Sequence, residues 1–277
     1  MSNKNMLFYL KTRDGFVFKI LSEFFSSCMM RCAFNIDKNG LSMLSTDNKN
    51  HRLFSVMMPR LKFRNFTFSK PFTFDVNSNH LHKIMKTIRK KDSLTMYITE
   101  ESPHELNISV SQGLENIEST STIRIMYVHP ANIDIIDYSE KSYVNCTGKD
   151  FQKIKNLSNI GKKTNVVLNK KDILFECDGS DVISKSIKIG EDNEHNNDKN
   201  NEQVKVSIQT VYISSLSKIA SISSNVLIYI CENSPVKITF DIPTVGDFNV
   251  FIKTEKMISE EDKQDADTDA NDDNETY

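Results

Sequence analysis

The sequence predicts an α+β protein made of two similar domains, each with two helices packed on antiparallel sheets. The first observation behind this prediction is a weak internal repeat. Leu81-His-Lys-Ile84 and Tyr97-Ile-Thr-Glu100 return as Leu216-Ser-Lys-Ile219 and Tyr229-Ile-Cys-Glu232. Each copy then continues into a Ser-Pro pair and an alternating apolar segment. Self-similarity over such a distance indicates duplicated structural units, and a chain of 277 residues has room for two domains.

Four short amphipathic segments are the second observation. Apolar residues recur at helical spacing in residues 14–27, 78–89, 149–159 and 213–221, and Asp14 is placed to cap the first segment. Basic residues lie on the polar side of every segment or directly after it: Lys19 in the first, Lys83, Lys86 and Arg89 in the second with Lys90 directly after it, Lys153 and Lys155 in the third, and Lys218 in the fourth. Only the second segment is densely basic, because Lys91 follows Lys90 and extends its cluster to five bases.

The third observation is a period of two between the helices, as in residues 72–76, 204–208 and 236–240. Such strands bury one face and expose the other, which is typical of antiparallel sheets. We predict an N-terminal domain over residues 1–126, a connector over 127–144 and a C-terminal domain over 145–258. The C-terminal domain is expected to contain a flexible loop at 190–203, and a tail follows it over 259–277.

The tail separates the charge of the chain. Residues 259–277 hold nine acids and one base, which leaves 34 bases and 28 acids in the rest of the chain. An acidic, Asn-containing segment with few apolar residues buries too little surface to fold, so we expect the tail to be disordered. Without its tail the protein is mildly basic.

Composition favours a binding scaffold over an enzyme. The sequence holds neither a phosphate-binding glycine-rich loop nor a nucleophile elbow, and its five cysteines are scattered. We expect core packing for Cys28 and Cys32, and no metal at His80 and His82, because histidines two apart on a helix point in different directions. No cofactor and no membrane span are expected, and the compartment is expected to be intracellular and reducing.

Three stretches resemble one family. Gly40-Leu-Ser-Met-Leu-Ser-Thr-Asp47 with His51 is similar to the first signature of the sliding clamps of the proliferating cell nuclear antigen (PCNA) type. Leu81-His-Lys-Ile-Met85 resembles the end of the second signature, and Leu157-Ser-Asn-Ile-Gly161 resembles the segment that closes the third helix. Ser69-Lys-Pro71 departs from the family pattern. The resemblance runs from about Met6 to Lys256 and implies a divergent, viral or protist member.

The resemblance implies that three chains form a ring around duplex DNA, with the helices lining the hole. Lysines on the helices then meet phosphates without reading bases, which suits sliding. The implied DNA-binding residues are Lys19, Lys83, Lys86, Arg89, Lys90, Lys153, Lys155 and Lys218, with most contact in the first half of the chain. Ring closure is implied to pair the strand near 119–126 with the strand near 182–189 of the next chain.

The implied partners are double-stranded DNA, a DNA polymerase, other proteins with a docking peptide, and a clamp loader, in a nucleus or a viral replication compartment. The implied partner-binding residues are His51, Phe54, Ile133, Ile135, Pro235, Phe251 and Ile252, around an apolar pocket. From the residues alone, Ile133, Ile135 and Ile136 either dock on a surface or form a buried strand.

Two alternatives remain beside a homotrimeric clamp. The chain can be one subunit of a heterotrimeric DNA-damage checkpoint clamp, which a mass measurement distinguishes from a homotrimer. It can also be a small nuclease with basic helices, which predicts metal-dependent turnover of DNA. A helix-face lysine is usually only a solvated charge, so the DNA-binding hypothesis depends on the whole set of lysines rather than on any one.

Overall fold

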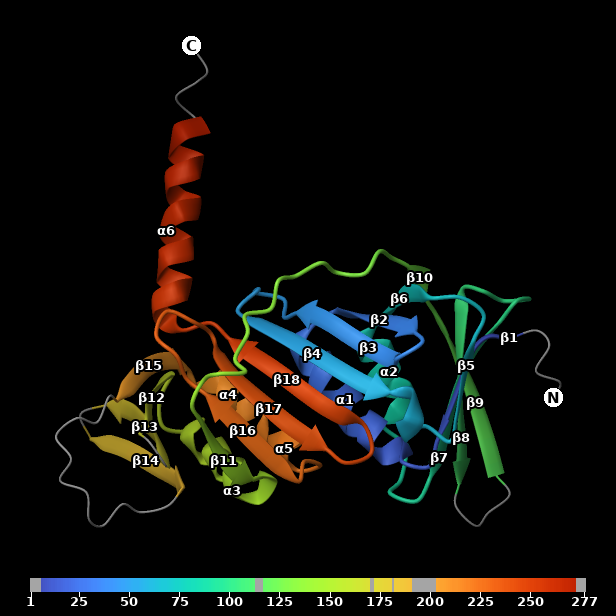
Figure 1. Cartoon of the computed structure of the whole chain (residues 1–277), viewed down its shortest axis with the longest axis horizontal. Coiled ribbons are helices and arrows are strands. Elements are labelled where there is room, and N and C mark those ends of the chain that lie inside the picture. Colours follow the sequence, from blue (N-terminus) through green and yellow to red (C-terminus); the bar gives the residue numbers. More distant parts are fainter. Residues whose placement is uncertain (1–5, 113–116, 170–171, 181, 191–202, 273–277) are drawn as a thin grey trace. The chain divides into compact units, whose positions relative to one another are not determined.

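The computed structural model describes residues 6–112, 117–169, 172–180, 182–190 and 203–272, with side chains up to Gln264. The chain divides into two compact units, coloured along the sequence in Figure 1. The first unit comprises Met1–Ile136, Lys218–Ser224 and Thr239–Asn249, and the second comprises Asp137–Ser217, Asn225–Ile238 and Val250–Tyr277. The main division therefore falls inside the expected connector. Most of the expected loop at 190–203 lies outside the described residues.

The first unit is built from antiparallel strands and two helices. Its elements are β1 (Met6–Thr12), α1 (Gly15–Cys28), β2 (Arg31–Asp37), β3 (Gly40–Thr46), β4 (Arg52–Pro59), the 3-10 turn η2 (Arg60–Lys62), β5 (Asn65–Phe68), β6 (Phe72–Asn77), α2 (Ser78–Met85), β7 (Ser93–Thr99), β8 (Glu105–Gln112), β9 (Ile117–Arg124) and β10 (Met126–Tyr127). One sheet has the order β5-β1-β7-β8-β9, and β10-β6-β2-β3-β4 are neighbours in another. In Figure 1, α1 and α2 lie behind the strands β2, β3 and β4.

Phenylalanine fills the core of this unit. Alternation along β4 turns Phe54 inward, where its ring meets that of Phe24 edge to face at 5.4 Å between centroids. Phe248 lies 5.7 Å from Phe24, also edge to face, and 6.3 Å from Phe54 in a tilted arrangement. Such edge-to-face pairs add stability beyond the area they bury. Helix α1 is thereby fixed against the sheet, which leaves its opposite side for other contacts.

The second unit has a similar composition of elements. They are β11 (Tyr143–Thr147), α3 (Gly148–Gln152), the 3-10 turn η3 (Lys153–Leu157), β12 (Lys163–Leu168), β13 (Asp172–Ser180), β14 (Ile183–Gly190), β15 (Val204–Gln209), α4 (Thr210–Ser215), α5 (Ser217–Ala220), β16 (Asn225–Tyr229), β17 (Val236–Ile242), β18 (Gly246–Ile252) and α6 (Glu255–Asp272). The strand orders are β14-β13-β12-β15 and β18-β17-β16-β11. Residues of α5, β17 and β18 are divided between the two units.

Three of the four expected helices are shorter or more broken than periodicity predicts. Helix α2 ends at Met85 instead of continuing to residue 89, because the carboxylate of Asp92 accepts a hydrogen bond from the backbone N–H of Arg89 at 2.8 Å and stabilises a turn. The third segment is helical for one turn and then 3-10. The fourth is split into α4 and α5, within a run where the Ser215 hydroxyl donates to the Tyr212 carbonyl at 2.9 Å and competes with regular backbone bonds. Asp14 occupies the N-cap position of α1, but its side chain makes no capping bond.

Residues 259–272 of the tail, where we expect disorder, continue helix α6, which spans Glu255–Asp272. The helix begins where the Thr254 hydroxyl accepts from the backbone N–H of Met257 at 3.3 Å, and the buried Ile258 anchors its first turn. Lys253 pairs with Glu261 at 2.7 Å across the following turns. Local capping and ion pairing thus stabilise the start of a helix that the net charge alone disfavours. Residues 273–277 lie outside the described residues.

Two glycines let separate segments of the second unit cross closely. A Cβ atom on Gly161 would lie 2.3 Å from the carbonyl oxygen of Asp178, and one on Gly179 would lie 2.1 Å from that of Ile160. Both distances are far below van der Waals contact, so only glycine fits at either position. In the described part of the chain, no helix is both long and apolar enough to cross a membrane.

Candidate functional site

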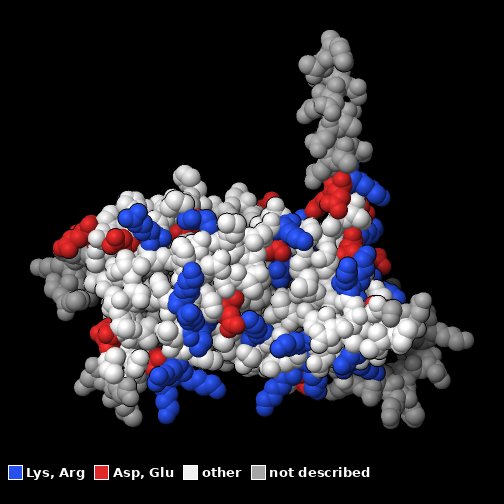
Figure 2. All heavy atoms as spheres, turned by 180° about the vertical axis from the view of Figure 1, so that it is seen from behind, with Lys and Arg blue, Asp and Glu red and all other residues white. Residues whose placement is uncertain are grey.

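Six side chains of the first unit form a basic surface, which we define as Lys19, Lys83, Lys86, Arg89, Lys90 and Lys218. Helices α1 and α2 pack against each other and carry Lys19 and Lys83, while Lys218 comes from α5. Figure 2, seen from the side opposite to Figure 1, shows Lys and Arg on the face that carries these helices, with acidic side chains scattered between them. The structure therefore brings together residues that lie up to 199 positions apart in the sequence.

The turn after α2 presents the densest part of this surface. The helix starts where the Asn77 side chain accepts from the backbone N–H of His80 at 3.0 Å. After its end, the buried Asp92 ties back to Arg89 through both its carboxylate and its backbone N–H. Because the acid is used inside the turn, the neighbouring exposed bases keep their charge uncompensated: Lys83, Lys86 and Lys90 form no ion pair with any described residue.

Lys19 is held more firmly than the others. Its ammonium donates to the carbonyl oxygen of Ile88 at 3.1 Å, which ties α1 to the turn. The Phe16 ring contacts two cations, with the Lys19 and Lys90 ammoniums 5.8 Å and 5.9 Å from its centroid. Cation–π contacts of this kind orient exposed lysines without neutralising them.

Lys218 is neutralised by an acid that sequence reasoning did not identify. Its ammonium donates to the carboxylate of Glu23 at 2.6 Å, and both side chains are partly exposed. This hydrogen bond lowers the pKa of Glu23 below its ordinary value of 4.5, partly offset by desolvation. A carboxylate with a lowered pKa stays ionised at neutral pH and loses the ion pair only as pH falls through that lowered pKa.

The second unit contributes only two of the expected DNA-binding residues. Lys153 and Lys155 lie on η3, and both are exposed. Lys153 pairs with Asp150 at 2.9 Å, an i,i+3 ion pair on the surface. Hydrogen bonds from Lys153 and Thr147 lower the pKa of Asp150, so this pair also persists at neutral pH. The expectation that most of the DNA contact falls on the first half of the chain therefore stays a prediction. It is supported by the unpaired bases Lys83, Lys86 and Lys90 on α2 and in the turn after it.

Sequence reasoning missed Arg13 as a member of the same neighbourhood. Arg13 is exposed in the connection between β1 and α1. Two residues later, the backbone N–H of Gly15 donates to the carbonyl oxygen of Asp92 at 3.2 Å. That bond places the connection beside the basic turn. A base directly before a predicted helix was the available signal, but helical periodicity gives no information on residues outside the helix.

The partner-binding residues implied by the resemblance fall into both units. His51, Phe54, Ile133 and Ile135 belong to the first, and Pro235, Phe251 and Ile252 to the second. Phe54 and Ile252 are 0% exposed, because alternation along β4 and β18 turns both toward the core. These two expectations are corrected: neither side chain reaches a surface where a partner could touch it. Ile135 and Ile136 are exposed, so the connector isoleucines are not a buried strand.

In the second unit, the buried Tyr138, which the resemblance did not name, packs beside two residues that it did name, Pro235 and Phe251. The Tyr138 hydroxyl donates to the carbonyl oxygen of Pro235 at 2.6 Å, and the Tyr138 ring lies 6.0 Å from that of Phe251. Burial raises the pKa of Tyr138 to about 12, so the hydroxyl remains a donor throughout the physiological range. The side chain of Lys237 projects into the same group of rings.

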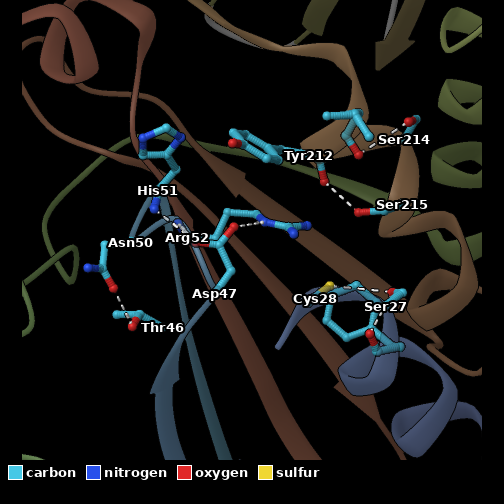
Figure 3. A network of polar contacts seen from close by, with 12 residues as sticks. Ser27, Cys28, Thr46, Asp47, Asn50, His51, Arg52, Tyr212, Ser214 and Ser215 are labelled. Carbon is cyan, nitrogen blue, oxygen red and sulfur yellow. Dashed lines mark hydrogen bonds and ion pairs between the residues drawn. The ribbon is translucent and has the colours of Figure 1, made fainter. Parts of the chain in front are cut away.

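A buried ion pair holds the loop before His51 (Figure 3). The Arg52 guanidinium contacts the Asp47 carboxylate at 3.0 Å, and the two side chains are only 7% and 4% exposed. The other oxygen of Asp47 accepts from the backbone N–H groups of His51 at 2.9 Å and Arg52 at 3.2 Å. Asn50 adopts a positive φ of 56° in this loop. The aspartate that ends the first signature thus shapes the loop that carries His51.

We expect Asp47→Ala to lower the free energy of unfolding by about 3 kcal/mol, since it removes one partner of a buried ion pair and leaves the other charge in a poorly solvated place. Urea unfolding monitored by circular dichroism measures the change. Asp150→Ala is the matched control, because its exposed pair with Lys153 contributes less than about 1 kcal/mol. Equal losses in the two variants would contradict this account of the loop.

Both small sheets end in an exposed strand. β9 is the edge of the first unit's five-stranded sheet, and β14 is the edge of the second unit's four-stranded sheet. The two strands have the same sequence of exposed and buried positions, with exposed apolar side chains at Ile117 and Ile183. Glu118 on β9 and Lys185 on β14 carry opposite charges. Long exposed edges invite pairing with another strand.

The described residues contain no group of three or more His, Cys, Asp or Glu side chains arranged to hold a metal ion. Two surface pockets of about 590 Å³ and 960 Å³ lie in the second unit. They are lined by β15 with α6, and by the segment after η3 with the start of α4, respectively. Neither contains residues of the basic surface.

Known proteins match the chain along almost its whole length. Residues 7–133 match the N-terminal domain of proliferating cell nuclear antigen, and residues 132–255 match its C-terminal domain. The chain is 24% identical over 264 residues to a "Probable DNA polymerase sliding clamp" of Autographa californica nuclear polyhedrosis virus, covering 92% of this chain and 99% of that protein. It is 20% identical to "Probable DNA polymerase sliding clamp 1" of Paramecium bursaria Chlorella virus 1, covering 89% and 96%.

Cellular relatives and a solved structure agree with these matches. The proliferating cell nuclear antigen of Saccharomyces cerevisiae is 22% identical, covering 84% of this chain and 92% of that protein. The crystal structure of the Entamoeba histolytica protein of the same name superposes with a TM-score of 0.78 at 19% identity, over 90% of this chain and 99% of that one. The predicted fold class, two similar α+β domains with helices on antiparallel sheets, is confirmed. With both domains matched in sequence and the fold shared, the chain belongs to the proliferating cell nuclear antigen family.

Proposed function

We propose that this chain is a DNA polymerase processivity factor, a sliding clamp that encircles duplex DNA and tethers a polymerase to it. The observation that carries the proposal is that both family domains are matched in one chain, including by viral proteins named as DNA polymerase sliding clamps. The uncompensated bases on α2 and its following turn support the same conclusion, since a phosphate backbone attracts exposed lysines regardless of base sequence.

The exposed edges support ring assembly. We propose that β9 of one chain pairs with β14 of the next, and that three chains close a homotrimeric ring. Head-to-tail pairing satisfies the backbone groups of both edges and buries Ile117 and Ile183. A clamp loader would open such a ring, and polymerases and other partners would dock through short peptides.

We propose no catalytic role for the chain. Its action is to bind and tether, through surface charge and an outer docking face, wherever DNA is replicated: in a nucleus or in a viral replication compartment. Relatives from two viruses and from yeast are consistent with either place.

The mass of the purified chain tests ring assembly. Light scattering should give three times the chain mass of 31.8 kDa for a homotrimer. A stable monomer would contradict the homotrimer and would favour a subunit of a heterotrimeric checkpoint clamp. The same measurement on a chain that ends before Ser259 asks whether α6 contributes, and we expect it to remain trimeric because β9 and β14 are untouched.

We expect Glu23→Gln to tighten binding to duplex DNA several-fold at low salt. The substitution removes the anion that holds the Lys218 ammonium at 2.6 Å and so adds one free cation to the basic surface. The slope of log K against log salt should steepen by about 0.9, the value for one more phosphate contact. Glu140→Gln, an exposed acid of the connector, is the control. Weaker binding by Glu23→Gln would show that Lys218 does not face DNA.

A further inference from the structure

The outer face of the sheet β18-β17-β16-β11 carries a row of aromatic residues around one lysine. Side chains alternate along β17, so Val236 and Ile238 are buried in the core while Lys237 projects to the opposite face. Tyr229 of β16 projects to that face as well and is paired in register with Tyr143 of β11. All of these residues belong to the second unit.

Three rings surround the Lys237 ammonium, and we call this group the lysine cage. The nitrogen lies 5.0 Å from the ring centroid of Tyr229, 5.3 Å from that of Tyr138 and 5.9 Å from that of Phe251. Each distance is within the range of a favourable cation–π contact. Tyr138 covers the strands because its hydroxyl is bonded to Pro235, and its ring meets Tyr229 edge to face at 5.9 Å.

The cage holds the cation but leaves its hydrogen-bonding capacity unused. An ammonium has three N–H donors, and ring faces do not accept as carboxylates do. Lys237 donates no hydrogen bond to any described residue and forms no ion pair with one. Asp137 is the nearby acid, but its carboxylate is bonded to the backbone N–H and the hydroxyl of Ser139, both at 2.9 Å.

A partly desolvated, unpaired cation favours an incoming anion. Water is displaced from the side of the ammonium that faces the rings, which strengthens its interaction with an added charge relative to a fully solvated lysine. Tyr143 beside the cage is exposed, and its ring lies 5.3 Å from that of Tyr229. An apolar side chain placed there would pack on an aromatic platform directly next to the cation.

We propose that the lysine cage binds a carboxylate of the docking peptide, so that partners of this clamp carry Asp or Glu next to an apolar anchor. The proposal rests on the proposed function, because it assumes that partners dock on this outer face. An apolar plug alone would need no cation at its centre. The cage therefore adds a charge requirement, which selects among partner peptides by the carboxylate they carry.

Two synthetic peptides test the proposal by fluorescence anisotropy with the full chain. They share Leu and Phe anchors and differ only in having Asp or Asn at the adjacent positions. We expect the Asp peptide to bind the wild type about tenfold or more tightly, the range for a hydrogen bond between charged groups. Lys237→Met should abolish that preference, since methionine keeps an unbranched side chain that packs on rings but has no charge.

Two further variants complete the test. Lys237→Arg should retain a preference for Asp, and Lys205→Met, which removes an exposed lysine from β15, should leave the preference unchanged. Equal binding of both peptides by the wild type would overturn the proposal. So would a preference that persists in Lys237→Met, or a failure of both peptides to bind. None of these results bears on encirclement of DNA, which retention on circular DNA tests independently.

Discussion

Replacing Lys83, Lys86 and Lys90 by alanine should weaken binding to duplex DNA by at least tenfold at low salt. These three ammoniums are exposed, and none of them is paired with an acid among the described residues, so each is available to a phosphate. Each phosphate contact contributes about 0.9 to the slope of log K against log salt. Titrations at several salt concentrations should therefore give a slope shallower by about 2–3 in the triple variant.

The control for this experiment removes the same number of charges elsewhere. Lys38, Lys49 and Lys70 are exposed in turns between strands of the first unit, and their joint replacement by alanine should leave the slope unchanged. Two duplexes of different sequence should lose affinity equally, because phosphate contacts carry no sequence information. A triple variant that binds as the wild type does would exclude the basic surface as the DNA-facing side.

Ile183→Asp should convert the trimer into a monomer. Ile183 is 51% exposed at the start of β14, the edge strand proposed to pair with β9 of the next chain. Closing the ring would bury the aspartate against β9 of the next chain, and burying an unpaired charge costs several kcal/mol at each of three interfaces. Light scattering should report one third of the wild-type mass.

The fold of the variant must be shown separately. Thermal unfolding should stay within a few degrees of that of the isolated wild-type subunit, because Ile183 is exposed within the chain itself. Val211→Asp, at an exposed position on α4, is the matched control and should keep the wild-type mass. A trimeric Ile183→Asp chain would show that the ring closes through a different edge.

Much of the fold could be predicted from the sequence because its signals are local or repeated. The repeat around Leu81 and Leu216, together with the alternation between helices, is enough to indicate two similar α+β domains. Helix lengths were less predictable. Asp92, which ends the helical path after Met85, acts through one side-chain hydrogen bond that periodicity does not record.

Acid–base pairing across the sequence was the part of the site that could not be predicted. The pair of Lys153 and Asp150 could be predicted, because the two residues are three positions apart on one helical turn. The pair of Lys218 and Glu23 could not, because 195 positions separate them in the sequence. The lysine cage likewise depends on Tyr138, which is bonded to a residue 97 positions away. The burial of Phe54 and Ile252, in contrast, follows from the alternation of apolar residues along their strands. This local pattern predicts that neither side chain is available to a partner.

A clamp that encircles DNA is held by the topology of the DNA and not only by contacts with it. Retention on DNA of different topology tests this most directly: the loaded protein is applied with a nicked circular plasmid to a gel-filtration column, before and after the plasmid is linearised. Encirclement predicts that protein co-elutes with the circle and is lost from the linear form, because a ring slides off free ends. Equal retention on both forms, or equal loss from both, would contradict it.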